Sequence, residues 1–116
     1  MAGTELVVVT LPAEIDMANA DNVSEQIAVA FAPGPRAVIA DMTVTTFCDI
    51  SGIRVLVLAH KRATAHGAEL RLLRPCDRLL RVMEVLGVDA VLPIYHSLAE
   101  ALAGGGEAEA ESWSMA

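Results

Sequence analysis

A chain of 116 residues fits one domain with a single hydrophobic core, because chains of this size bury roughly two thirds of their unfolded surface. Hydrophobic residues make up 54% of it but aromatic residues only 3%, so the core must be built from Val, Leu, Ile and Ala. The net charge of −7 argues against nucleic acid as a partner and favours a basic protein. No apolar stretch approaches the roughly 20 residues of a membrane span, and the basic region of a signal peptide is missing, so we expect a cytoplasmic protein.

The first part of the chain predicts a strand followed by a helix. Residues 5–11 are rich in valine and favour a strand, which Pro12 bends before a polar segment that begins at Asp16. Asn19 or Asp21 can cap the helix that follows. The buried stripe of this helix has helical spacing and consists of Val23, Ile27, Ala30 and Phe31.

A second predicted strand leads into the most polar part of the sequence. Residues 36–42 are apolar enough for a central strand that is buried on both faces. The stretch 41–52 then contains three threonines, a serine, two aspartates and a cysteine, and a helix begins near Ser51 or Gly52. Because a helix start has backbone N–H groups without partners, this junction is a candidate functional site that can bind an anion.

The helix that begins there is predicted from its length. Residues 53–58 alone fit a buried strand as well as a helix, but the segment continues with late basic residues to Gly67, which favours a helix. Its first two turns are apolar nearly all round. Either one face beside Ser51 stays exposed for a partner, with Val55 and Leu58 in the contact, or the helix is buried on two sides.

The next segment predicts one more strand, one helix and a short strand. Residues 69–73 favour a strand, and Asp77 can cap a helix that ends at Gly87. Residues 91–95 favour a last short strand. The inward-facing residues of the helix are predicted to be Leu79, Leu80, Met83 and Leu86.

The end of the chain predicts a short helix and a tail. Ser97 and Glu100 have the spacing of a capping box, which indicates a helix start, and three consecutive glycines end this helix. The remaining residues are mostly Ala, Glu and Ser and cannot bury enough surface to fold. We therefore expect one domain over residues 1–103 and a disordered acidic tail over residues 104–116.

The alternation of strands and helices predicts an α/β fold. We expect a small, mostly parallel sheet of four to five strands, joined by right-handed crossovers and flanked by about four helices.

The sequence has no pattern that is typical of an enzyme or a metal site. It lacks the Gly-Lys-Ser/Thr phosphate loop, Gly-x-Ser-x-Gly and His-Glu-x-x-His. His60 and His66 do not share a helical face and His96 lies apart, so we expect three solvated histidines. We predict no enzymatic activity, no metal and no cofactor.

The aspartates and cysteines of the loop region have ordinary structural interpretations. Asp41 and Asp49 flank the threonines, and we interpret them as residues that cap and solubilise the loop rather than as an acid/base pair. Cys48 and Cys76 lack metal-type spacing, and we interpret them as reduced, buried thiols.

The loop also has a family resemblance. Phe-Cys-Asp-Ile-Ser-Gly-Ile at residues 47–53 resembles the Asp-Ser-Ser/Thr-Gly loop of the STAS domain, the fold of bacterial anti-sigma factor antagonists. The resemblance covers about residues 5–103, and it includes Glu-Ile-Asp at 14–16 and Leu-Gly-Val at 86–88. It implies a small sheet of four or five strands with helices on its flanks.

The resemblance implies a function in transcription regulation by protein binding. In the family, the loop and the following helix bind an anti-sigma factor that is also a serine kinase, and this frees a sigma factor. The kinase phosphorylates the serine after the aspartate, and the added charge of about −1.5 to −2 stops binding. This chain has Ile50 there, so that phosphorylation is not implied. The implied partner-binding residues are Asp16, Asp49, Ile50, Ser51, Gly52, Val55 and Leu58.

Several alternatives stay open at this point. Ser51 is either a neighbouring phosphorylation site or the N-cap of the helix. The protein itself is a monomer or weak dimer that serves as an antagonist, as a STAS docking subunit of a transport or signalling complex, or as a small anion- or nucleotide-binding module.

Overall fold

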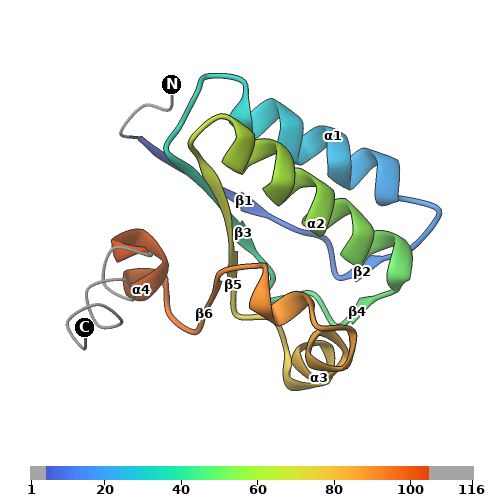
Figure 1. Ribbon diagram of the computed structural model, residues 1–116. Coiled ribbons are helices and arrows are strands. Elements are labelled where there is room, and N and C mark those ends of the chain that lie inside the picture. Colours follow the sequence, from blue (N-terminus) through green and yellow to red (C-terminus); the bar gives the residue numbers. More distant parts are fainter. Residues whose placement is uncertain (1–4, 105–116) are drawn as a thin grey trace.

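The computed structural model describes residues 5–104, which form two parallel sheets and four α-helices (Figure 1). The larger sheet has the strand order β1-β3-β5-β6, and all of its neighbouring strands are parallel. The predicted α/β fold with a mostly parallel sheet is therefore confirmed. The strands of this sheet are β1 (Leu6–Thr10), β3 (Ala37–Asp41), β5 (Glu69–Leu73) and β6 (Ile94–Tyr95).

The helices cover the two faces of the larger sheet unequally. Helices α1 (Ala20–Phe31) and α2 (Ile50–Ala65) lie side by side over one face (Figure 1). The short helix α4 (Leu98–Ala103) packs on β5 and β6, where Ala101 joins a small cluster of the opposite face. Helix α3 (Asp77–Leu86) contacts the 3-10 helix η1 (Val88–Ala90).

A second, two-stranded sheet extends the first and was missing from the sequence-based expectation. It pairs β2 (Glu14–Ile15) with β4 (Phe47–Cys48) in parallel. The chain enters β2 after the bend at Pro12, whose carbonyl accepts a 2.8 Å hydrogen bond from the hydroxyl of Thr45. Two residues are too few to show a strand pattern, so only the pairing of these distant segments creates the sheet.

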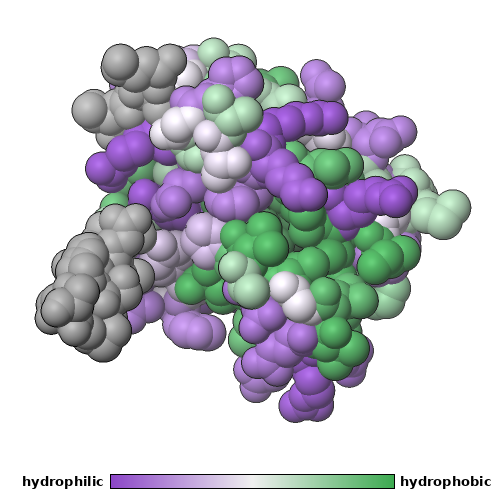
Figure 2. All heavy atoms as spheres, in the orientation of Figure 1, coloured by the Kyte–Doolittle hydropathy of each residue, from purple (hydrophilic) through white to green (hydrophobic). Residues whose placement is uncertain are grey.

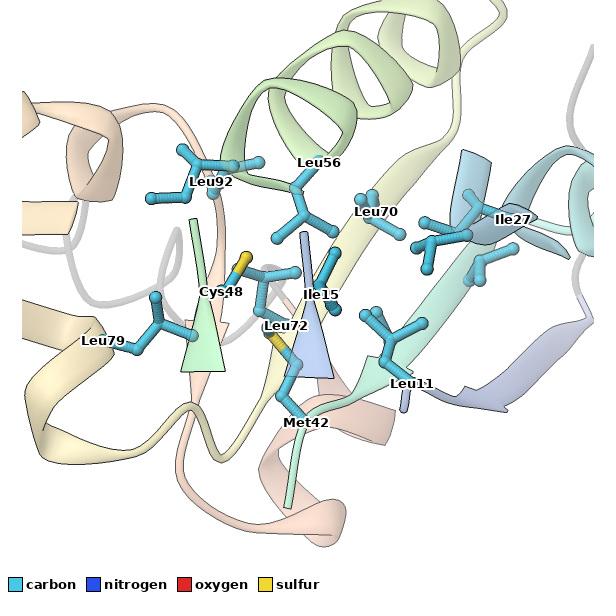
Figure 3. Packing of buried hydrophobic residues seen from close by; sticks show 14 of the residues in the cluster. Leu11, Ile15, Ile27, Met42, Cys48, Leu56, Leu70, Leu72, Leu79 and Leu92 are labelled. Atoms are coloured by element: carbon cyan, nitrogen blue, oxygen red, sulfur yellow. The ribbon is translucent and has the colours of Figure 1, made fainter. Parts of the chain in front are cut away.

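The main core lies between the sheets and the layer formed by α1 and α2. Alternate residues of the central strands point towards these helices, which is the side-chain pattern of strands (Figure 3). As the amino-acid composition predicts, the core is almost entirely aliphatic. Its fully buried large members include Leu11, Ile15, Ile27, Met42, Leu56, Leu70, Leu72 and Met83.

Three details of the last third of the chain differ from expectation. Cys76, not Asp77, is the N-cap residue of α3, and it makes no side-chain cap bond. Leu86 was predicted to be buried, but it is 46% exposed, in the last turn of α3 before the left-handed Gly87 that ends the helix. Residue 91 belongs to a turn after η1, so the strand predicted over 91–95 is shortened to β6.

Asn19 and Ser97, two residues predicted to cap helices, are both N-cap residues. Asn19 is the N-cap residue of α1, but its side chain bonds to the Asp16 N–H and the Glu14 carbonyl rather than to the helix. Ser97 caps α4, since its hydroxyl accepts a bond from the Glu100 N–H at 3.1 Å. Each cap thus fixes how the chain enters its helix.

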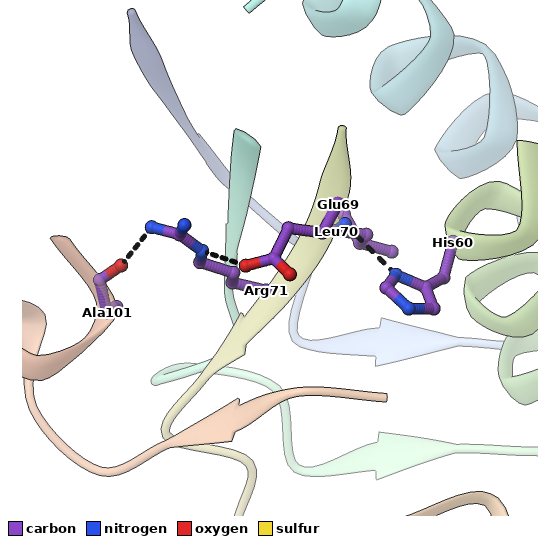
Figure 4. Close-up of polar contacts among 5 residues, drawn as sticks. All are labelled: His60, Glu69, Leu70, Arg71 and Ala101. Atoms are coloured by element: carbon purple, nitrogen blue, oxygen red, sulfur yellow. Dashed lines mark hydrogen bonds and ion pairs between the residues drawn. The ribbon is translucent and has the colours of Figure 1, made fainter. Parts of the chain in front are cut away.

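The prediction that all three histidines are solvated is wrong for His60. This side chain is only 8% exposed, and its Nδ1 accepts a 3.1 Å hydrogen bond from the Leu70 N–H (Figure 4). The Leu70 N–H points to the side of β5 where β6 would continue, but β6 pairs only with residues 72–73. His60 therefore satisfies a strand N–H that has no strand partner. His66 and His96 are exposed, as predicted.

Candidate functional site

Pairing of the two short strands brings the predicted site residues together. Asp16 follows β2 and Asp49 follows β4, so both aspartates lie at the same end of the small sheet. The Asp49 N–H donates to the Ile15 carbonyl at 3.0 Å, which continues the pairing past the strands. The carboxyl ends of parallel strands are common positions for binding sites, because the loops that follow them meet there.

Asp49 is the N-cap of α2, and the interpretation of Ser51 as the cap is wrong. The Oδ1 atom of Asp49 accepts hydrogen bonds from the backbone N–H groups of Ser51 at 2.9 Å and Gly52 at 3.2 Å. The same oxygen accepts the hydroxyl of Ser51. The N–H groups that could have held an external anion are thus bonded to the protein's own carboxylate.

These bonds keep Asp49 charged. The hydrogen bond from the Ser51 hydroxyl is the largest cause that lowers the pKa of Asp49, and the N–H groups of Gly52, Ser51 and Met17 lower it further. Partial burial acts in the opposite direction. The start of α2 therefore presents a fixed negative charge beside the β2–α1 turn that contains Met17.

Gly52 lets α2 approach the small sheet closely. A Cβ atom at this position would lie 2.5 Å from the Cys48 sulfur and 2.6 Å from Cγ2 of Ile15. Both of these side chains lie in the core beneath the helix (Figure 3). Burial, with a smaller effect of the Asp49 charge, raises the pKa of Cys48 to about 12, so this thiol is neutral and packs as an apolar group.

Asp41 and the loop threonines have structural partners. Asp41 accepts hydrogen bonds from both the N–H and the hydroxyl of Thr43, and the Thr46 hydroxyl donates to the Ala13 carbonyl. Asp41 therefore caps the loop, as expected, whereas Asp49, also expected to cap the loop, is the N-cap of α2. No bond joins the two carboxylates in the part of the chain that the structure describes.

Ile50 is the most exposed of the predicted site residues. It is the first residue of α2 and is 65% exposed. Met17, after β2, and Phe47, in β4, are also exposed apolar side chains. Leu58 is also exposed, two turns further along the outer side of α2. Val55, by contrast, is partly buried against the main core, which leaves less of its surface for a partner.

An apolar surface on α3 and η1 was not anticipated from the sequence. Figure 2 shows apolar side chains gathered around α3, η1 and the nearby end of α2. Val85 is 81% exposed, although Leu79 and Met83 of the same helix are buried. The signal was present, because α3 has more apolar residues than one buried face needs. The exposed members are Val82, Val85, Leu86 and Val91.

Within residues 5–104, no cluster of three or more His, Cys, Asp or Glu side chains is placed to hold a metal ion. None of the helices described is both long and apolar enough to cross a membrane.

Comparison with known proteins gives a family match for the chain. The family model of the STAS domain matches residues 2–101. An anti-sigma factor antagonist from Mycobacterium paratuberculosis has a similar structure, with 22% identity and a TM-score of 0.76, over 89% of this chain and 87% of that chain. An anti-sigma-factor antagonist (STAS) domain protein from Planctomyces limnophilus has 23% identity and a TM-score of 0.73, over 88% and 91% of the chains.

A third similar structure belongs to a protein of a different class, a transporter family protein. The sulfate transporter family protein from Wolinella succinogenes has 19% identity and a TM-score of 0.74, over 89% of this chain and 86% of that chain. No curated protein matches the sequence. At these identities the structural matches show a shared fold, which both regulators and transporters contain.

Proposed function

Since the chain belongs to the STAS domain family, we propose that it is an anti-sigma factor antagonist that regulates transcription in the cytoplasm. It acts without catalysis, by binding an anti-sigma factor of the serine-kinase type and so releasing a sigma factor. The binding surface comprises the Asp49 loop, Ile50 and the outer side of α2 that includes Leu58.

The exposed Ile50 at the start of α2 is the observation that supports this proposal. Large exposed apolar side chains often mark binding surfaces, and Ile50, Met17 and Phe47 are all exposed on the segments that adjoin the paired strands β2 and β4. Full burial of such a side chain in a complex contributes about 1.5 to 3 kcal/mol, or roughly one to two powers of ten in affinity. Ile50 is thus suited to contact a partner protein.

The same residue removes the usual switch. Ile50 occupies the position that follows the aspartate, and it has no hydroxyl to phosphorylate. The neighbouring hydroxyl of Ser51 is half-buried and donates to Asp49, so a phosphate on it would stand against that carboxylate. We infer that the partner stays bound without control by phosphorylation at either residue.

A binding measurement tests the surface. The Ile50→Asp variant is expected to bind purified anti-sigma factor kinases of the same organism at least about tenfold more weakly than the parent. Val29→Asp is the matched control, because Val29 is equally apolar and exposed but lies on α1. Equal affinities of the parent and Ile50→Asp, measured by calorimetry, would contradict the proposal.

A phosphorylation assay tests the missing switch. After incubation with the same kinase and ATP, the Ile50→Ser variant should gain one phosphate by intact mass, and the parent should gain none. The variant serves as the positive control for kinase activity. A phosphate mapped to Ser51 in the parent would make Ser51 the switch and would overturn this part of the proposal.

The similarity to a sulfate transporter family protein favours a second candidate function. In that case the chain is a docking subunit of a transport or signalling complex. Affinity capture followed by mass spectrometry separates the two, since a kinase is expected for the antagonist and a transport ATPase for the docking subunit. The binding of an anion or nucleotide at the α2 start is the weakest candidate, because Asp49 already fills that position.

A further inference from the structure

A groove lies between α1 and α2, far from the Asp49 loop. Its volume is about 410 Å³, and it is formed by the second half of α1, the loop before β3 and the last turns of α2. Small-molecule sites in proteins have volumes of roughly 300 to 1,000 Å³. Arg62 lines the groove, and Ile50 is the first residue of α2. At a rise of 1.5 Å per residue these two residues lie about 18 Å apart along the helix.

The groove is hollow because small residues face each other across it. Ala28 on α1 and Ala59 and Ala63 on α2 line it, where larger apolar residues would interdigitate in a close-packed helix pair. Phe31 supplies a flat apolar wall. The space between the helices is therefore suited to an apolar group.

The rim of the groove is cationic. Arg62 and His66 lie one helical turn apart, and none of the described lining residues carries a carboxylate. Within residues 5–104 the only ion pair joins Arg71 to Glu69, so the Arg62 guanidinium pairs with no carboxylate there. The His66 Nδ1 atom lies 2.9 Å from the Arg62 carbonyl and donates a hydrogen bond to it, so Nδ1 is not available to a ligand.

The positive charge of the Arg62 guanidinium at the rim favours an anionic ligand. The chain has 15 Asp and Glu but only 8 Lys and Arg residues, so a rim with Arg62 and no carboxylate runs against its overall composition. Interaction with the dipole of α2 explains a basic residue in its last turn, but it does not explain the hollow beside that residue. The guanidinium fork matches the geometry of a carboxylate or a phosphate.

We propose that the α1–α2 groove binds a small carboxylate with an alkyl or aryl body. The carboxylate pairs with the Arg62 guanidinium, and the body packs against Phe31 and the alanines. The volume accommodates on the order of ten non-hydrogen atoms, which corresponds to a medium-chain fatty acid such as octanoate. This site is independent of the partner surface at the other end of α2.

Titration of the full chain with octanoate, followed by backbone amide NMR, tests the proposal. Octanoate should shift the signals of Ala28, Ala59 and Ala63, whereas octylamine and acetate at the same concentrations should not. Arg62→Met should weaken binding by about tenfold or more, because it removes the charge and keeps the apolar stem. Arg54→Met, on the exposed outer side of α2, is the matched control and should bind like the parent.

A second variant fills the space instead of removing the charge. Ala28→Leu is on the exposed side of α1 and should also weaken octanoate binding about tenfold. Anionic phospholipid vesicles should not shift the groove signals, since the ligand is a free carboxylate. Equal binding of octanoate and octylamine, unchanged affinity in Arg62→Met, or shifts caused by vesicles alone would each overturn the proposal.

Discussion

At the scale of single residues, Gly52 determines how closely α2 approaches the small sheet. Substitution Gly52→Ala places a Cβ 2.5 Å from the Cys48 sulfur, and the resulting strain should exceed the helix-propensity gain of about 1 kcal/mol. We expect a net loss of about 1 to 3 kcal/mol in the free energy of unfolding, measured with urea. Arg54→Ala on the exposed side of α2 is the control, and a Gly52→Ala variant as stable as the parent would contradict the argument.

His60 is the residue that links stability to pH. Burial lowers the pKa of His60, and the charge of Glu69 opposes this only in part. The folded state therefore binds fewer protons than the unfolded state, whose histidine pKa is about 6.5. The stabilisation is fully present above that value and is lost as the pH falls through the lower folded pKa.

We predict that the free energy of unfolding decreases when the pH falls below about 6.5. The decrease should be smaller in His60→Gln, which does not titrate in this range. His66→Gln, which changes an exposed histidine, is the comparison variant. Urea unfolding at several pH values measures the slope of the unfolding free energy against pH. Identical slopes for His60→Gln and the parent would refute the assignment of this pH dependence to His60.

At the scale of elements, Arg71 holds α4 against the sheet. Its side chain is only 4% exposed, and it donates to the Ala101 carbonyl at 2.8 Å and to Glu69 at 2.6 Å (Figure 4). Gly104 closes over the guanidinium, where a Cβ would overlap the guanidinium group. Helix α4 is only six residues long, so these bonds rather than helix propensity stabilise it.

Replacement Arg71→Met should therefore release α4 without unfolding the rest. Loss of the hydrogen bonds is expected to cost about 1 to 3 kcal/mol. Amide hydrogen exchange should show lost protection in α4, while α1 and α2 stay protected. Arg78→Met, which changes an exposed arginine of α3, is the control. Uniform loss of protection in all helices would instead indicate global destabilisation.

At the scale of the whole molecule, the domain is predicted to be complete without the acidic tail. Most of the tail predicted over 104–116 lies outside the described residues, but Gly104 is buried and its N–H donates to the Glu100 carbonyl at 2.8 Å. Truncation after Gly104 should therefore leave the melting temperature nearly unchanged. Trp113 is the only tryptophan, and blue-shifted, quencher-protected emission from it would contradict this expectation.

Much of the fold was determined by sequence patterns of local origin. Apolar runs and helical spacing indicated the α/β class, helices α1 to α3 and strands β1, β3 and β5, because these patterns are repeated over five residues or more. The short strand β6 was predicted too long. The Asp-Ile-Ser-Gly sequence indicated the position of the candidate site.

Tertiary structure alone decided the details that depend on distant neighbours. Asp49 and Ser51 are both good caps locally, but pairing of β4 with β2 fixes Asp49 as the cap of α2. His60 is buried because β6 is too short to cover the Leu70 N–H. The exposed side of α3 and the groove beside α2 likewise depend on which element covers each face. Periodicity shows that a residue is apolar, but burial depends on packing between segments far apart in the chain.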